Sequence, residues 1–175
     1  HCGRLPLLRK RGFRGPIYAT PACRDLARIL LADSAFMAER EAERYRRRQA
    51  EHGNRHARGF PDPLFTRVDA DETIQQFKPM AYGRATEVLP GVTLTFRDAG
   101  HILGSASVWL QLEEEGARTR IVFSGDVGQY DSPILREPQT DPGVSVDIAL
   151  MESTYGDRRR GQDVSAEISR PGLRL

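Results

Sequence analysis

Cysteine is scarce in this chain of 175 residues, which contains only Cys2 and Cys23. Two cysteines do not build the disulfide framework of a small secreted domain, so we expect a reducing, cytoplasmic environment. Long apolar runs are also missing. The most apolar stretch, ARILLADSAFMA, is interrupted by Asp33 and Ser34 and is too short to cross a bilayer. The composition therefore excludes a disulfide-rich scaffold and predicts a soluble chain with no membrane segment.

Lysine is almost absent, since Lys10 and Lys78 are the only two, although lysine and arginine together number 26. Arginine binds phosphate with two parallel hydrogen bonds, which lysine does not. A biased codon composition gives the same excess of arginine, however, and the net charge of +2 does not by itself indicate nucleic acid. The charge balance leaves both explanations open.

The first third of the sequence predicts a short strand followed by a long helix. The stretch GPIYAT is typical of a strand, and Pro21 stands where proline can open a helix. Apolar residues from Leu26 to Met37 recur at helical spacing from about Cys23 onward. The helix then becomes EREAERYRRR, which favours a solvated face because glutamates alternate with the arginines. An RNA-contacting basic surface is the alternative.

The rest of the sequence predicts one short helix and several strands, which makes the fold class α/β. Asp69 or Asp71 is the expected cap of the helix in DADETIQQF. ATEVLPGVTLTFRDA alternates around a turn at Pro90 and Gly91. ASVWLQLEEEGARTRIVFSGD predicts a hairpin with its turn at residues 113–118, and Trp109 is expected in the core. VDIALMEST supplies one more apolar strand.

Three residues with metal-binding or catalytic chemistry follow these strands. They are His101, Asp126 and Glu152. Side chains at the ends of neighbouring strands can converge on one point, where ligands usually bind. Imidazole and carboxylate together suit zinc. The residues alone leave simpler interpretations open, because an isolated histidine can be a core residue and the aspartate of SGD can form a turn.

Four segments, in order, carry a resemblance to a known family. HCGRLPLL, DAGHILGSA, FSGDVG and MESTYGDR resemble the metallo-β-lactamase-fold hydrolases of the β-CASP group, which process RNA as nucleases and include exonucleases. The resemblance covers residues 1–158 and implies a partial αββα sandwich that lacks its first strands and the following β-CASP domain. Residues 159–175 are expected to be a divergent or truncated lead-in to that domain. The sequence begins at His1, so we interpret it as an internal piece of a longer protein.

The resemblance also implies roles for individual residues. His1 is similar to a ligand of the second zinc, His101 to a ligand of the first, and Asp126 to the carboxylate that bridges both ions. Glu152 is similar to the acidic residue that opens the β-CASP motifs and orients a histidine from the second domain, so Asp126 and Glu152 are the expected catalytic residues. The small residues of GHILGSA are expected to let the backbone bend closely beside the site.

The implied activity of the parent protein is hydrolysis of RNA phosphodiester bonds by a hydroxide that two zinc ions activate. RNA is the expected partner, a membrane is not, and a homodimer of the parent is allowed. Because most of the family's site precedes or follows this sequence, we predict that the chain alone is inactive. The alternatives are a non-catalytic scaffold in an RNA-processing assembly, and a hydrolase of small esters or thioesters.

Overall fold

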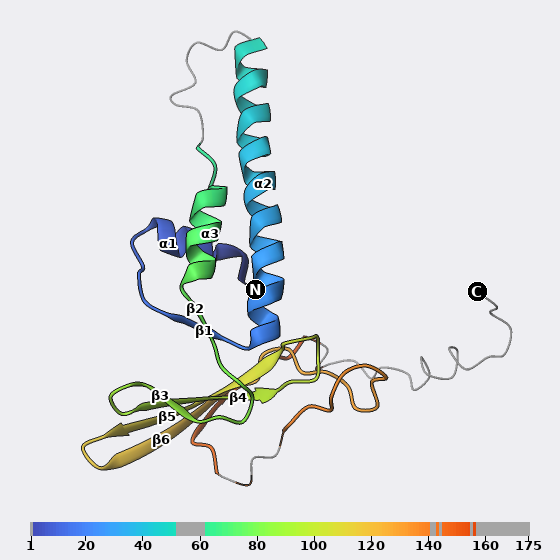
Figure 1. Ribbon diagram of the computed structural model, residues 1–175. Helices are drawn as coiled ribbons and strands as arrows, with labels where there is room; N and C mark the ends of the chain where they lie inside the picture. The colour runs from blue at the N-terminus through green and yellow to red at the C-terminus, as the bar shows by residue number, and fades with distance from the viewer. Residues whose placement is uncertain (1, 52–61, 141–142, 144, 155, 157–175) are drawn as a thin grey trace, which may run out of the picture.

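The computed structural model describes residues 2–51, 62–140, 143, 145–154 and 156. A helical part stands above one face of a sheet, and the longest helix projects away from that sheet (Figure 1). This mixed α/β arrangement confirms the predicted fold class and is consistent with part of a metallo-β-lactamase fold. In chain order the elements are η1 (Cys2–Arg4), α1 (Leu5–Lys10), β1 (Ile17–Ala19), α2 (Pro21–Glu51), α3 (Arg67–Gln75), β2 (Phe77–Pro79), β3 (Thr86–Leu89), β4 (Val92–Asp98), β5 (Ala106–Glu114), β6 (Ala117–Phe123) and β7 (Ile148–Leu150).

Helix α2 begins at Pro21, as the sequence predicted, because the first turn of a helix does not use the N–H that proline lacks. Its buried residues Ala27, Leu31 and Ala35 recur every four positions and so share one face. This face packs against α3, which contributes to the same core cluster. The second half of α2, rich in glutamate and arginine, is mostly exposed, as expected for a solvated helix face.

Thr66 caps helix α3. The hydroxyl of Thr66 accepts the N–H of Asp69 at 3.3 Å, and the Asp69 carboxylate accepts the N–H of Thr66 at 2.8 Å. This reciprocal pair is a capping box. The prediction of Asp69 or Asp71 as the cap was wrong, because Asp69 lies three residues inside the helix and returns the hydrogen bond to Thr66.

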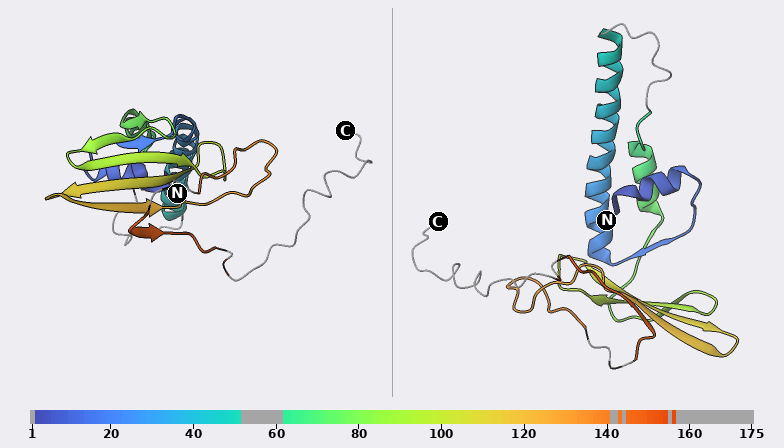
Figure 2. Two further views of the ribbon diagram at one scale, coloured as in Figure 1. Left: turned by 90° about the horizontal axis from the view of Figure 1, so that it is seen from below. Right: turned by 180° about the vertical axis from the view of Figure 1, so that it is seen from behind.

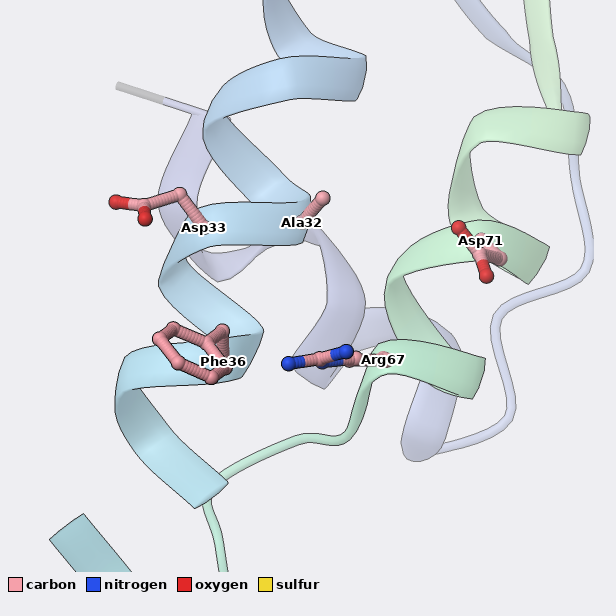
Figure 3. Close-up of a pocket in the computed structure, with 5 residues that line it drawn as sticks. All are labelled: Ala32, Asp33, Phe36, Arg67 and Asp71. Atoms are coloured by element: carbon pink, nitrogen blue, oxygen red, sulfur yellow. The ribbon is translucent and has the colours of Figure 1, made fainter. Parts of the chain in front are cut away.

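A hollow of about 530 Å³ lies between α2 and α3 (Figure 3). In it the guanidinium of Arg67 extends from α3 over the ring of Phe36, 4.8 Å from the ring centre. Glu39 accepts the backbone N–H of Arg67 at 2.9 Å and forms an ion pair with its side chain at 3.5 Å. The guanidinium of Arg67 therefore already has partners within the protein, and its contacts with Phe36 and Glu39 connect α3 to α2.

Two short parallel strands connect the helical part to the sheet. In this pair β1 aligns Ile17 with Phe77 of β2. The N–H of Met80 continues the pairing with the carbonyl of Ala19 at 2.8 Å. From Met80 the chain passes directly into the large sheet. Within the described residues, no helix is long and apolar enough to traverse a membrane.

The large sheet has the strand order β3-β4-β5-β6-β7. The first three pairings are antiparallel, and β7 is parallel to β6. The predicted turn at Pro90 and Gly91 joins β3 to β4. The β5–β6 turn is tighter than predicted, because pairing continues to Glu114 and leaves only Glu115 and Gly116 between the strands. Both have positive φ, 49° and 82°, as a two-residue hairpin turn requires.

The two faces of this sheet differ in composition. The face toward the helical part is apolar, and its central residues are Leu94 and Phe96 of β4 and Val108 and Leu110 of β5. Successive side chains of a strand point to opposite faces, so Trp109 points away from this cluster, and its ring is partly exposed. The prediction that Trp109 is a core residue was therefore wrong, since its two apolar neighbours take the core positions.

Candidate active site

The sheet brings the predicted site residues to one edge. Strands β4 and β6 both pair antiparallel with β5, so they run in the same direction, and β7 is parallel to β6. His101 follows β4, Asp126 follows β6 and Glu152 follows β7. The carboxyl ends of the three strands therefore lie at the same edge, and the loops that leave them meet there.

His101 and Asp126 face each other at this edge. His101 Nε2 and Asp126 Oδ2 are 3.8 Å apart, and 44% of each side chain is exposed. This separation exceeds a hydrogen bond, so the two groups do not satisfy each other directly. Because both are half exposed, a ligand that binds nitrogen and oxygen donors can reach them from solvent.

The His101 loop is held by side-chain hydrogen bonds and by close backbone packing. Ser105 Oγ accepts the N–H groups of His101 and Ile102 at 3.1 and 3.2 Å. Gly104 has a φ of 85°, and a Cβ atom there would lie 2.5 Å from the backbone nitrogen of Cys23. The small residues of this loop therefore allow the backbone to bend closely, as predicted, and the partner they approach is the first turn of α2.

We expect Ser105→Ala to lower the free energy of unfolding by about 1 kcal/mol, since two exposed N–H groups lose their acceptor and water replaces it. The larger effect should be local. Amide hydrogen exchange of His101 and Ile102, followed by NMR, should become faster while the sheet amides keep their protection. The exposed Ser153→Ala is the matched control, and unchanged exchange at His101 in the Ser105 variant would contradict the assignment.

Tyr82 supports the same loop from the core side of the sheet. Its hydroxyl donates to the carbonyl of Ser105 at 2.8 Å. Burial raises the pKa of the Tyr82 phenol above its usual range, and the negative charge of Asp98 adds to this, while Thr20 and Arg136 oppose it. The neutral, donating form of Tyr82 is therefore the one that the fold favours.

A raised pKa means that Tyr82 contributes stability below pH about 10, and that this contribution is lost as the pH rises through the folded-state pKa. In an ultraviolet absorbance titration, we expect a late tyrosine ionisation step, above the usual range of a phenol, because the pKa of Tyr82 is raised. Tyr82→Phe should remove this late step, whereas Tyr45→Phe, at an exposed position of α2, should leave it. A late step that survives in Tyr82→Phe would show that another tyrosine is responsible.

The Asp126 loop lies directly against the His101 loop. The N–H of Gly128 donates to the carbonyl of Ala99 at 2.8 Å. A Cβ atom at Gly128 would overlap the Gly100 carbonyl group and would come within 2.7 Å of the His101 nitrogen. Glycine at position 128 therefore allows the close backbone approach that brings Asp126 to His101, a role that the sequence analysis missed.

Glu152 attaches the Asp126 loop to β7. Its carboxylate accepts the N–H of Val127 at 2.7 Å and the hydroxyl of Thr154 at 3.1 Å. Its own N–H donates to Ser124 Oγ at 3.1 Å. The hydrogen bond from the Val127 N–H is the main cause that lowers the pKa of the Glu152 carboxyl below its usual value. The hydrogen bond from Thr154 and the charge of His101 lower this pKa further, and desolvation raises it. Glu152 thus stays ionised and positions Asp126, while its expected role toward a histidine of a second domain stays a prediction.

Several predicted residues lie outside the described part of the chain. These are His1 and the segment 159–175. Among the described residues, no group of three or more histidine, cysteine, aspartate or glutamate side chains is arranged to hold a metal ion. His101 and Asp126 together fit two positions of a zinc centre, by donor type and by accessibility. A catalytic zinc takes three protein ligands, so this pair needs further donors.

Comparison with known proteins finds sequence similarity to two kinds of protein. The chain is 34% identical to ribonuclease TTHA0252 of Thermus thermophilus over 158 residues, and this alignment covers 90% of the chain. It is 31% and 34% identical to the transcription termination factors FttA of a Lokiarchaeum species and of Pyrococcus horikoshii, each over 89% of this chain. No protein-family model matches the chain.

The similarity covers only part of each relative. The chain spans 30% of the Thermus ribonuclease and 21% of each of the two termination factors. It corresponds to a segment of these longer proteins, and the segment contains the whole edge of the sheet where His101, Asp126 and Glu152 lie.

Proposed function

We propose that this chain is part of the metallo-β-lactamase domain of a zinc-dependent RNA hydrolase of the β-CASP group. The observation that carries the proposal is the pair formed by His101 and Asp126, which face each other at 3.8 Å from loops at one edge of the sheet. Identity of 34% with a protein named ribonuclease supports RNA as the substrate and phosphodiester hydrolysis as the reaction.

In this proposal His101 would bind the first zinc, His1 would bind the second, and the Asp126 carboxylate would contribute to holding both. Zinc bound here would act as a Lewis acid, which lowers the pKa of a zinc-bound water to about 7 and offsets the negative charge of a phosphate. The chain's own contribution is orientation. Ser105 fixes the backbone of His101, and Glu152 fixes the loop of Asp126 through Val127.

The metal-binding part of the proposal can be tested on the 175-residue chain by titration with cobalt(II), whose visible absorption reports coordination. His101→Ala and Asp126→Asn should each weaken cobalt binding more than about tenfold. Loss of a residue that only hydrogen-bonds a metal ligand already weakens binding by about tenfold, and loss of a ligand itself should cost more. Glu114→Gln, which removes a carboxylate from the distant β5–β6 hairpin, is the control. Binding that is equal in all four proteins would remove the basis for a metal site at this edge.

Activity is a separate test. We expect the 175-residue chain, incubated with zinc and labelled RNA, to give no appreciable cleavage, because His101 and Asp126 supply too few ligands for a catalytic zinc. Cleavage that His101→Ala abolishes would contradict this expectation of inactivity while supporting the hydrolase. Cleavage that persists in His101→Ala would come from elsewhere and would count against the proposed site.

The second candidate is a non-catalytic role in an RNA-processing or transcription-termination assembly. The observation that favours it is the name of the archaeal relatives, transcription termination factor. In that case loss of cobalt binding in His101→Ala would leave the biological role of the parent protein intact, whereas a hydrolase would lose its function with its metal.

A further inference from the structure

Thr20 lies where the helical part meets the edge of the large sheet. It stands between β1 and α2, directly before Pro21. Seen from behind, the first turn of α2 lies at the edge of the sheet, and the rest of the helix projects away from it (Figure 2, right). Thr20 is only 2% exposed, so its hydroxyl is in the interior. A buried hydroxyl needs hydrogen-bond partners within the protein.

The Thr20 hydroxyl both accepts and donates a hydrogen bond. Its oxygen accepts the N–H of Cys23 at 3.2 Å, which is the contact of a residue that caps the start of a helix. Its proton goes to the carbonyl of Gly104 at 2.7 Å. A cap needs only an acceptor, so capping of α2 does not account for this second bond. The bond to Gly104 joins the start of α2 to the His101 loop.

Tyr82 makes a similar contact with the next residue of the loop. Its hydroxyl donates to the Ser105 carbonyl at 2.8 Å, so two hydroxyls hold two successive carbonyls. The Ser105 carbonyl also accepts the N–H of Ala99 at 3.3 Å and keeps this partner without Tyr82. Among the described residues, Thr20 is the donor to the Gly104 carbonyl. Loss of the Thr20 hydroxyl should therefore affect the loop more than loss of the Tyr82 hydroxyl.

We propose that Thr20 is a positioning residue for His101. The loop that it holds is the one in which Ser105 Oγ accepts the N–H of His101 at 3.1 Å. A Cβ atom at Gly104 would lie 2.5 Å from the Cys23 nitrogen, so the loop and α2 are already in close contact there. A shift of the loop would change the 3.8 Å separation of His101 and Asp126. The consequence for metal binding rests on the proposed function, and the placement of the loop does not.

Amide hydrogen exchange of the metal-free 175-residue chain, followed by NMR, tests the placement of the loop. Thr20→Val keeps the shape of the side chain but removes the hydroxyl, so exchange at His101 and Ile102 should become faster. Thr20→Ser keeps both hydrogen bonds and should exchange as the wild type does. The matched control is Thr73→Val inside α3. Thr73 is 0% exposed, and its hydroxyl donates to the carbonyl of Asp69 at 2.6 Å.

The control separates a local effect from a general loss of stability. Thr73→Val should lower the midpoint of urea denaturation, because it also removes a buried hydroxyl. Exchange at His101 and Ile102 should nevertheless stay at the wild-type rate when the protein is folded.

Cobalt(II) titration of the same variants tests the consequence for metal binding. Thr20→Val should weaken cobalt binding by about tenfold, the lower end of the range for residues that orient a metal ligand. Tyr82→Phe should act in the same direction with a smaller effect. Thr20→Ser and Thr73→Val should bind cobalt as the wild type does.

The outcomes distinguish this role of Thr20 from the proposed function. Unchanged exchange at His101 in Thr20→Val, or exchange equally fast in Thr73→Val, would overturn the positioning role. Unchanged cobalt affinity in Thr20→Val would also overturn it if His101→Ala weakens binding. Cobalt binding that survives in His101→Ala would count against the metal site, and hydrogen exchange would then decide the role of Thr20 by itself.

Discussion

Alanine in place of Gly128 is expected to cost more than about 4 kcal/mol of unfolding free energy, which few single substitutions reach. The added methyl group would occupy the space of the Gly100 carbonyl, and neither backbone segment is a flexible side chain that can move aside. Relief requires the Asp126 loop to move away from the His101 loop. The hydrogen bond from Gly128 to Ala99 would then be lost together with the approach of the two site residues.

Urea denaturation followed by circular dichroism measures this cost, and cobalt(II) titration tests whether the proposed metal binding is lost with it. Gly3→Ala is the matched control, since a methyl group there has nothing within 4 Å. The total stability of a domain is about 5–15 kcal/mol, so the Gly128 variant is expected to be partly unfolded or to have a markedly lower midpoint. A midpoint equal to that of Gly3→Ala would mean that the two loops are not in contact.

Leu31→Ala is expected to destabilise the helical part by about 2–5 kcal/mol. Leu31 is fully buried at 0% exposure in the core cluster between α2 and α3. Alanine is an excellent helix former, so the loss comes from the cavity and from the lost burial, not from α2 itself. Because Gly104 packs on the first turn of α2, loosening of this helix should also reach the His101 loop.

Leu30 provides a control on the same helix turn. Its side chain is 55% exposed, and Leu30→Ala should change the free energy of unfolding by no more than about 0.5 kcal/mol. The two variants are compared by urea denaturation under identical conditions. Equal midpoints would show that α2 does not pack through the face that carries Leu31.

The elements of the fold follow from local patterns in the sequence. Pro21 opens α2, the alternation around Pro90 and Gly91 predicts β3 and β4, and the hairpin of β5 and β6 is confirmed apart from its tighter turn. These features depend on residues close together in the chain. The cap of α3 was missed because Thr66 and Asp69 share the hydrogen bonds, and an acidic residue near a helix start is consistent with either position.

The contacts that assemble the site join residues that are distant in the chain, and local sequence patterns do not show such contacts. The convergence of His101 and Asp126 was expected from strand ends, but the position of Gly128 against Gly100 depends on how two loops pack. Glu152 was assigned from resemblance to a role outside this chain, whereas its visible contacts hold Val127. Trp109 was assigned to the core because its neighbours Val108 and Leu110 are also apolar, so the sequence shows no alternation at this point of the strand. Which of these residues face the core depends on the side of the sheet that the helices cover.

The single parallel pairing in the sheet has a consequence for the order in which the protein forms during synthesis. Strands β3 to β6 join through short connections and can pair as they leave the ribosome, whereas β7 pairs with β6 only after a long connection has been made. Closing a long loop is slow compared with forming a hairpin. Glu152 follows β7 and restrains the Asp126 loop, so a nascent chain has a folded sheet before it has an organised site. Assembly of the edge that carries His101 and Asp126 is therefore a late event in the folding of this chain.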